Sequence, residues 1–408
     1  MVRQVATTDH DRWVITFDNY GIGHGFDRQG FGEAWLQAQG ISAIHVMGRS
    51  EDWYQYDDLE EALSVVRAAV SRASRVMTYG SSMGGYAAIR FAEAVGANAV
   101  LAFSPQYTLD PRIAGHDGRW AQDSRRIVWL PALNGPVRCT VKPVIVYDSV
   151  SPDRWHAERF ARDTTVTAVT LPHTGHPVTS FLAEVGFLAG LVHETLEGSL
   201  DAGAFRRRVR EQRRRSGVYL GQLAENASLR RPGLALSLAH RAAEVSNGND
   251  LAQLSLARLL LAASRHEEAL KIFESLADRS GRQITYLIAY AQALAEAGRL
   301  DQARRLVDEV VAAAGGMAHV HAWAASICWL NGDVADARRM IETAIALDPG
   351  SRGYRGLLAT YRFGRRHSGD QSRQPTVWLA LARWVARRWP QTEITRVLSR
   401  FQRRMRST

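Results

Sequence analysis

A serine framed by glycines is the first group in this chain that could carry out covalent chemistry. The segment VMTYGSSMGGYAAIRFAE contains the pattern G-x-S-x-G, formed by Gly80, Ser82 and Gly84. A serine at the tip of a sharp strand-to-helix turn has a strained backbone, and side chains two positions away would collide there unless they are glycine. The pattern predicts a nucleophilic hydroxyl on Ser82, whereas Ser81 should point elsewhere. A plain strand–turn–helix connection is the alternative interpretation.

A serine nucleophile needs a base and an acid, and both residue types follow later apolar runs. Asp148 and Asp153 follow the run KPVIVY, and His173 and His176 follow the run VTAVTL. An imidazole can take the serine proton, while a carboxylate fixes the imidazole tautomer and stabilises the imidazolium. The order serine, acid, histidine along the chain is one of the known orders for this chemistry. From the residues alone, both acids and both histidines remain candidates.

The elements that must position these groups alternate in type over residues 1–198. Strands are predicted at 12–17, 41–47, 75–79, 98–103, 142–147 and 166–171. Helices are predicted at 31–39, 57–72, 83–95, 153–162 and 177–196. This alternation predicts an α/β domain with a doubly wound, mostly parallel sheet. Ligands of such sheets bind at the carboxyl ends of the strands, and each candidate group follows a strand end.

Beyond residue 216 a 34-residue repeat replaces the strands. Small residues recur in two registers, at Ala235, Ala269, Ala303 and Ala337 and at Ala257, Ala291, Ala325 and Ala359. Alanine at these positions lets paired helices approach closely. The pattern resembles tetratricopeptide repeats and predicts an all-α solenoid over 217–363. We expect 199–216 to be an arginine-rich linker and 364–408 to be a basic C-terminal capping helix or tail.

The first half of the chain resembles the α/β-hydrolase superfamily over residues 12–196. The resemblance rests on the segment GSSMG, on the acid after a strand and on the segment TGH. In that superfamily the acid usually lies a few residues past the strand end, before a helix, which favours Asp153 and leaves Asp148 as the second choice. The histidine usually follows a glycine, which favours His176 over His173.

The same resemblance implies where a negatively charged oxygen would be stabilised. The backbone N–H of Met83 and one from the loop DNYGIGHG should form the oxyanion hole. We place the second donor at Asn19 or Tyr20, although an ordinary flexible loop is the alternative. The short connection 104–141 leaves room only for a minimal cap, with Trp120 and Tyr107 expected near the pocket.

Aromatic residues also follow the predicted strand at 41–47. Trp53, Tyr54 and Tyr56 could line an acyl or sugar site, or simply cover the core. His173 and His156 are expected to be pocket-lining or surface residues. A polar, lightly covered site suits a small ester or a glycan-borne acyl group better than a long lipid.

The composition is that of a globular protein, and its positive charge is confined to two segments. The chain has 408 residues, is 46% hydrophobic and 23% charged, and carries a net charge of +10. Residues 205–215 contain seven arginines and residues 365–408 contain eleven. The remainder is slightly acidic, and no nucleic-acid motif with interleaved aromatic residues occurs. Nucleic-acid binding is therefore not expected.

Cysteine usage and hydropathy bear on location. Cys139 and Cys328 lie in different regions, and no Cys/His cluster has zinc spacing, so neither a disulfide framework nor a metal site is expected. The start lacks the layout of a secretory signal, and no apolar run approaches the roughly 20 residues that cross a bilayer. These features predict a cytoplasmic protein, and nothing in the sequence indicates a cofactor.

The expected function is that of a serine hydrolase, an esterase or deacylase with acyl transfer as a variant. Ser82, Asp153 and His176 would act on the acyl substrate, and the repeats would dock a protein partner or a substrate-bearing chain in their groove. The alternative is an inert hydrolase-like scaffold whose repeats mediate protein interaction. For the tail we expect a packed capping helix, with peripheral membrane contact or a partner site as alternatives.

Overall fold

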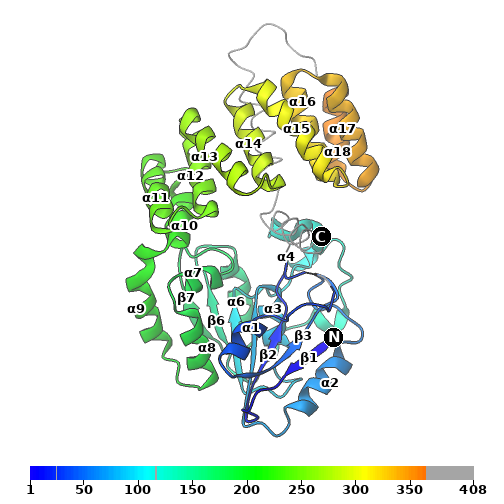
Figure 1. Cartoon of the computed structure of the whole chain (residues 1–408). Helices are drawn as coiled ribbons and strands as arrows, with labels where there is room; N and C mark the ends of the chain where they lie inside the picture. The colour runs from blue at the N-terminus through cyan, green and yellow to red at the C-terminus, as the bar shows by residue number, and fades with distance from the viewer. Residues whose placement is uncertain (24, 115–116, 364–408) are drawn as a thin grey trace. The chain divides into compact units, whose positions relative to one another are not determined.

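The computed structural model describes residues 1–363 except 24 and 115–116 (Figure 1). The chain forms two compact units, of which the first contains residues 1–227 and the second begins at Ser228. The predicted capping helix or tail, 364–408, lies outside the described residues. The first unit is an α/β fold and the second is helical, as the sequence predicts.

The first unit is built on one seven-stranded sheet with the order β1-β3-β2-β4-β5-β6-β7. The strands are β1 (Val2–Val5), β2 (Arg12–Phe17), β3 (Ser42–Val46), β4 (Arg75–Ser81), β5 (Ala99–Phe103), β6 (Val144–Tyr147) and β7 (Thr167–Thr170). All neighbours from β3 to β7 pair in parallel, whereas β1 pairs antiparallel to β3. Strand β1 escaped prediction because its sequence, VRQV, is short and half polar.

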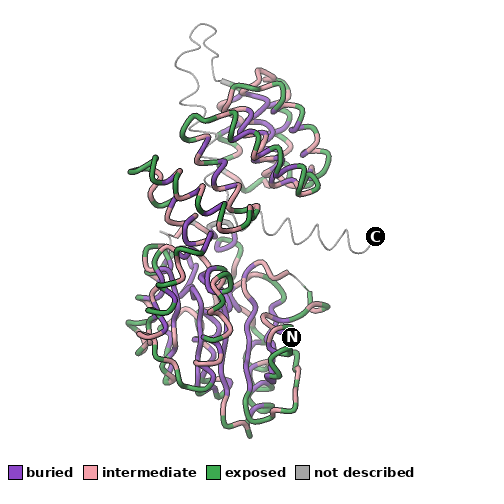
Figure 2. The backbone as a smooth tube through the Cα atoms, turned by 60° about the vertical axis from the view of Figure 1, so that its left-hand side comes forward, coloured by how far each residue is buried: buried purple, intermediate pink, exposed green. Residues whose placement is uncertain are grey.

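Helices cover both faces of the sheet, which explains the nearly continuous apolar runs in its central strands. Trp13, Ile15 and Phe17 of β2 belong to the large core cluster that includes helical residues beside the elbow. Thr16 points to the opposite face, where its hydroxyl contacts Nδ1 of His45 at 2.6 Å. Figure 2 shows the strands as a buried layer within the first unit.

The helices of the first unit broadly follow the predicted segments. They are α1 (Glu33–Ala38), α2 (Leu59–Ala69), α3 (Met83–Arg90), α4 (Pro111–Ala114), α5 (Ala121–Ser124), α6 (Asp153–Asp163), α7 (Thr179–Glu184), α8 (Leu188–Leu196), α9 (Ala202–Gln212) and α10 (Gly217–Ala227). The segment predicted as one helix over 177–196 is two helices, because Gly186 adopts a positive φ of 76° between them.

The arginine-rich segment is a helix, which differs from the linker predicted over 199–216. Asp201 caps α9 by accepting hydrogen bonds from the backbone N–H groups of Gly203 and Ala204. Phe205 and Val209 are fully buried, while the arginines occupy the outer positions of the helix. Phe205 and Val209 form an apolar stripe between the arginines, and its burial packs α9 against the rest of the first unit.

The second unit consists of antiparallel helix pairs. Its helices are α11 (Pro232–Val245), α12 (Asp250–Ala262), α13 (His266–Arg279), α14 (Ile284–Glu296), α15 (Leu300–Ala314), α16 (Ala318–Asn331), α17 (Val334–Leu347) and α18 (Arg352–Phe363). The alanines at positions 257, 269, 291, 303, 325 and 337 are completely buried at the helix contacts. A larger side chain at these positions would force the helices apart.

Helix α10 differs from the prediction that the solenoid begins at residue 217. It belongs to the first unit. Glu184, at the end of α7, accepts hydrogen bonds from the backbone N–H groups of Gly217 and Val218 and from the hydroxyl of Ser216. These bonds satisfy the free N–H groups at the start of α10 and tie it to the sheet domain.

Candidate functional site

Ser82 lies on a strained turn between β4 and α3. Its φ of 57° is in the left-handed region, which is rare for a residue with a side chain. A Cβ on Gly80 would lie 2.2 Å from the carbonyl oxygen of Gly84, and one on Gly84 would lie 2.3 Å from that of Phe17. Both positions therefore require glycine, as the sequence pattern indicates. The turn presses the start of α3 against the end of β2.

The structure brings Ser82, His176 and Asp153 together in a hydrogen-bonded chain. The Oγ of Ser82 lies 3.0 Å from Nε2 of His176, and Nδ1 of His176 lies 2.8 Å from Oδ2 of Asp153. Asp153 is fully buried, while the Ser82 residue remains 5% exposed and the His176 side chain 14% exposed. This geometry allows the imidazole to accept the serine proton while the carboxylate receives the Nδ1–H hydrogen bond.

The two candidate acids have different neighbours. Asp153 begins helix α6, and its carboxylate faces His176. Asp148 instead accepts backbone hydrogen bonds from His173, Thr174 and Gly175, at 2.9–3.1 Å. Asp148 thus shapes the loop that carries the histidine but does not contact the imidazole. Only Asp153 is in position to orient His176.

A buried cluster of charges extends behind Asp153. Nη1 of Arg119 lies 2.7 Å from Oδ1 of Asp153, and Nη2 of Arg119 lies 2.8 Å from Asp117. Asp117 also contacts Nε2 of His156 at 3.0 Å, and Nδ1 of His156 accepts the backbone N–H of Tyr107 at 3.1 Å. Because Nδ1 is an acceptor, the neutral imidazole of His156 carries its proton on Nε2.

These contacts move the pKa values of the acids in a definite direction. Burial raises the pKa of Asp153, but the charges and hydrogen bonds of His176 and Arg119 outweigh it and hold the pKa at about 2. Burial likewise opposes ionisation of Asp117, yet His156 and Arg119 keep its pKa well below the ordinary value. Burial lowers the pKa of His156. Both carboxylates are therefore charged at neutral pH, and His156 is neutral.

Aromatic rings border the imidazole of His176. The ring centroid of Trp120 lies 5.2 Å from that of His176. It also lies 6.2 Å from the ring centroid of Trp53 and 6.5 Å from that of Tyr20. The guanidinium of Arg119 lies over the Trp120 ring at 4.5 Å. The short cap therefore supplies both a charge to the acid and an apolar wall beside the histidine.

The remaining aromatic and histidine candidates have other hydrogen-bond partners. Tyr54 is buried against Phe17, and its hydroxyl donates to the carbonyl of Val46. The hydroxyl of Tyr56 donates to Ser50, that of Tyr107 donates to Asp163, and Nδ1 of His173 contacts Asn226. Of the aromatic residues named from sequence, only Tyr20, Trp53 and Trp120 belong to the cluster beside His176.

The predicted oxyanion donors lie at the same end of the sheet. Met83 is the first residue of α3, so its N–H has no acceptor within the helix. The loop that begins with Asn19 and Tyr20 follows β2, and the close approach of Gly84 to Phe17 brings that strand end beside the elbow. The Tyr20 hydroxyl donates to Asp123 at 2.9 Å, which anchors the loop to the cap.

Sequence reasoning missed two side chains that touch the central three. Gln106 follows β5, and its Oε1 lies 3.1 Å from Oγ of Ser82. Arg119 lies in the cap and contacts Asp153. Neither belongs to a recognisable motif. For Gln106 the available signal was its position just after a predicted strand, the feature that identified the other candidates.

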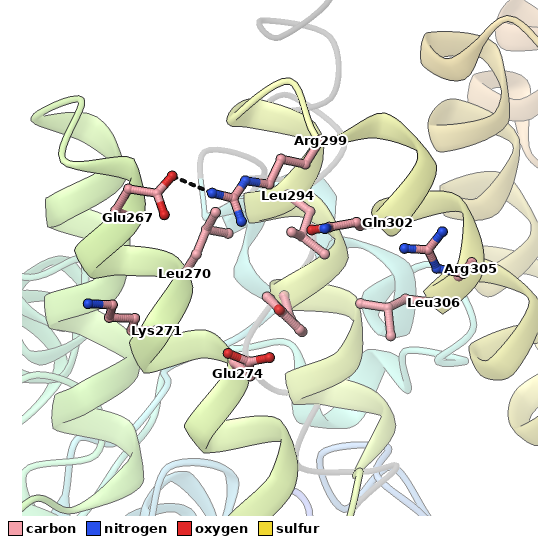
Figure 3. A pocket seen from close by; sticks show the side chains of 10 residues that line it. Glu267, Leu270, Lys271, Glu274, Leu294, Arg299, Gln302, Arg305 and Leu306 are labelled. Atoms are coloured by element: carbon pink, nitrogen blue, oxygen red, sulfur yellow. Dashed lines mark hydrogen bonds and ion pairs between the residues drawn. The ribbon is translucent and has the colours of Figure 1, made fainter.

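The repeat unit contains a hollow of about 420 Å³ between α13, α14 and α15 (Figure 3). Three leucines and a tyrosine form its apolar part, and six polar side chains surround them. The lining residues are Glu267, Leu270, Lys271, Glu274, Tyr290, Leu294, Arg299, Gln302, Arg305 and Leu306. Glu267 and Arg299 form an ion pair across the rim. The hollow could accept an apolar side chain flanked by charged groups.

Other functional features are limited in the described part of the chain. Among its residues, no three His, Cys, Asp or Glu side chains cluster as metal ligands. Cys139 and Cys328 are both buried free thiols, and burial raises the pKa of each to about 11. None of the described helices is long and apolar enough to cross a membrane.

Comparison with known proteins identifies the repeats. The family model "Tetratricopeptide repeat" matches residues 260–327 and 294–361. No curated protein sequence matches the chain significantly. Similar solved structures include MamA (residues 41 to the end) from Desulfovibrio magneticus RS-1, which has 16% identity and a TM-score of 0.30 over 41% of this chain and 96% of that one.

Two further similar structures are tetratricopeptide-repeat proteins. One is YrrB, described as having an unusual peptide-binding site, with 18% identity and a TM-score of 0.33 over 45% of this chain and 96% of that one. The other is a thermophilic protein of Thermus thermophilus, with 20% identity and a TM-score of 0.32 over 45% of this chain and 98% of that one. The family match by itself places tetratricopeptide repeats within residues 260–361 of this chain.

Proposed function

We propose that the first unit is a serine hydrolase of the α/β-hydrolase type that acts on an ester or thioester. The observation that carries the proposal is the hydrogen-bonded chain from Asp153 through His176 to Ser82. Oγ of Ser82 attacks the substrate carbonyl and its proton passes to Nε2 of His176. The bond to the alcohol or thiol of the substrate then breaks, and His176 gives this leaving group its proton, which leaves the acyl group on Ser82. Water, or another hydroxyl in the acyl-transfer variant, loses a proton to His176 as it attacks the acyl group, and Ser82 regains a proton as it departs.

Three features beyond the hydrogen bonds support this function. The positive φ of Ser82 costs free energy that a plain connection would avoid. The three groups follow the ends of β4, β6 and β7, in the chain order known for this reaction type. The aromatic wall of Tyr20, Trp53 and Trp120 is compact, which favours a small ester or a glycan-borne acyl group.

The test is covalent labelling of the full-length protein with a fluorophosphonate probe. We expect a single labelled residue, Ser82, identified by mass spectrometry of the digested protein. Labelling should disappear in Ser82→Ala and fall strongly in His176→Ala, while Ser81→Ala should label like the wild type. A wild-type protein that stays unlabelled, or one labelled at another serine, would contradict the proposal.

We propose further that the repeat unit binds a protein partner or a substrate-bearing chain. The presence of tetratricopeptide repeats and the mixed apolar and charged lining of the hollow support this role. If Ser82 proves unreactive, partner binding alone would be the function, as in the scaffold alternative. Reversing the rim charge with Lys271→Glu should change affinity for such a partner without changing ester hydrolysis.

A further inference from the structure

Gln106 is buried completely, and one end of its side chain contacts the hydroxyl of Ser82. Its Oε1 lies 3.1 Å from Oγ of Ser82, the atom that would form the new covalent bond. Its amide Nε2 is also buried and has no hydrogen-bond partner among the residues that the structure describes. A buried amide N–H without an acceptor is uncommon in proteins, so its presence beside Ser82 asks for an explanation.

The backbone around Gln106 is held from several sides. The N–H of Ser104 donates to the carbonyl of Val146 at 2.7 Å, and the N–H of Tyr107 donates to His156 at 3.1 Å. A Cβ on Gly85 would lie 3.0 Å from the carbonyl oxygen of Phe103, so this segment also packs directly against α3. The backbone that carries Gln106 is thus held next to the elbow.

The hydrogen-bonding capacity of Ser82 shows what this amide can do. The Ser82 hydroxyl has one proton but faces two acceptors, Oε1 of Gln106 and Nε2 of His176. Donation to Gln106 would withhold the proton from His176, the group that must receive it during attack. A half-turn of the Gln106 amide removes this competition, because it directs the Nε2–H donors toward Ser82 and leaves His176 as the only acceptor.

We propose that Gln106 is a catalytic residue. Its Nε2–H donates a hydrogen bond to the oxyanion that forms on the substrate carbonyl oxygen when Ser82 attacks. This inference rests on the proposed hydrolase function. As the Oγ–carbon bond forms, the carbonyl electron pair moves to oxygen and the Ser82 proton moves to His176. Gln106 transfers no proton. It adds a side-chain donor to the backbone N–H of Met83, directed at the charge that develops in the transition state.

The test compares two substitutions with a matched control. Gln106→Met keeps a side chain of similar length without a donor, and Gln106→Glu replaces the donor with a carboxylate oxygen. Ser81→Ala is the control, because its Oγ is likewise buried without a partner among the described residues, one position from Ser82. Each variant is assayed with a short p-nitrophenyl ester, with a fluorophosphonate and with an alkylboronic acid that forms a tetrahedral adduct.

We expect Gln106→Met to lower kcat by about 10²–10³ while KM changes little, as for loss of one oxyanion donor. Affinity for the boronic acid and the rate of Ser82 labelling should fall by comparable factors. The loss should be larger in Gln106→Glu, because the carboxylate repels the oxyanion. Ser81→Ala should keep kcat, and the melting temperature of Gln106→Met should be unchanged or higher, because an unpaired buried amide is removed.

If Gln106 had a purely structural role, Gln106→Met should have a lower melting temperature. Its kcat, KM and boronic-acid affinity should then change no more than the smaller fraction of folded protein explains. That result, or wild-type kcat in Gln106→Met, would overturn the inference about Gln106. The hydrolase proposal would stay intact as long as Ser82 of the wild type is labelled. Absence of Ser82-dependent labelling in the wild type would instead remove both proposals, so the two failures are distinguishable.

Discussion

The two units of this chain place their charged groups differently. In the sheet unit the carboxylates of Asp153 and Asp117 are almost completely buried and share Arg119. Most of the described ion pairs of the repeat unit lie on the surface, as in Arg282 with Glu309, whose side chains are 45% and 38% exposed. Buried charges are costly unless paired, whereas exposed pairs contribute little.

The two units also use strained backbone differently. In the sheet unit Ser82 and Ser104 adopt positive φ close to the candidate site, whereas in the repeat unit Asn247, Ser264 and Arg282 do so in the connections between helices. Helix contacts of the repeat unit depend on fully buried alanines such as Ala257 and Ala291. Buried charge lies where chemistry is proposed, while the repeats are stabilised by regular packing. Substitutions in the two units should therefore have different consequences.

The largest expected effect is on turnover and is confined to the sheet unit. Ser82→Ala should lower hydrolysis of a short p-nitrophenyl ester by on the order of 10⁶, the typical loss for a triad nucleophile. Thermal unfolding followed by circular dichroism should be nearly unchanged, because alanine keeps the Cβ and removes only the hydroxyl. Wild-type turnover in this variant would mean that the elbow is not the active site.

The next effect separates the two acids. Asp153→Asn should lower kcat by roughly 10⁴, since the wrong imidazole tautomer is favoured. In Asp148→Asn an amide oxygen can still accept a hydrogen bond, but the negative charge that faces three backbone N–H groups is lost. We therefore expect a smaller loss of kcat together with a lower melting temperature. Steady-state kinetics and melting curves of both variants decide this. The opposite order would move the acid role to Asp148.

Removing one arginine from each unit tests the contrast in charge burial. Arg119→Met leaves Asp153 and Asp117 without their cation, and should lower the free energy of unfolding by about 3 kcal/mol. We take the lower end of the usual range because the Arg119 side chain is 25% exposed. Arg282→Met in the repeat unit should cost about 0–1 kcal/mol. Urea denaturation measures both, and equal losses would contradict the contrast.

Below about pH 4, acid should destabilise the sheet unit more than the repeat unit. The folded pKa of Asp153 is about 2, below the unfolded value of about 3.9. Its contribution, on the order of 2 kcal/mol, is therefore present above about pH 4 and lost as the pH falls toward 2. Burial also lowers the pKa of His156, so the free energy of unfolding should begin to decline below about pH 6.5. Below that pH, His156 binds a proton in the unfolded chain but stays neutral in the folded protein.

Pulse proteolysis across pH 7 to 3, with fragments identified by mass spectrometry, follows the two units separately. The control is His156→Gln, which removes one titrating imidazole and should reduce the decline that begins below about pH 6.5 while leaving the later one. A part of the early decline should remain, because burial also lowers the pKa of His45. Burial lowers the pKa of His319 in the repeat unit to about 4, so that unit should also lose some stability below about pH 6.5. A repeat unit that lost more stability than the sheet unit below about pH 4 would contradict the difference in charge burial.

The last effect concerns the repeats alone. Ala291→Leu introduces a larger side chain at a fully buried helix contact and should destabilise the repeat unit by about 1–3 kcal/mol. Ester hydrolysis by the sheet unit should keep its wild-type kcat and KM. Differential scanning calorimetry together with the kinetic assay checks both statements. Loss of kcat in a folded Ala291→Leu protein would show that the units are coupled.

Much of this architecture is local in sequence and was predictable. Apolar runs such as 12–17 and 98–103 are strands, because a parallel strand is buried on both faces. The 34-residue spacing of small residues predicted the repeats that the family comparison identifies. The elbow was predictable in part. A side chain at Gly80 would collide with Gly84 within the same turn, whereas one at Gly84 would collide with Phe17 of the neighbouring strand, which is a tertiary contact.

What the sequence by itself determined was the set of groups at the strand ends, including Ser82, His176 and two acids. Only the tertiary structure decided that Asp153 faces His176 while Asp148 holds the loop, since both follow the same strand. Only packing of the cap could bring Arg119 to Asp153, across 34 residues. The reason is physical. Periodicity records which face of an element is buried, but contacts between distant polar side chains depend on how loops close, and no local pattern encodes that distance.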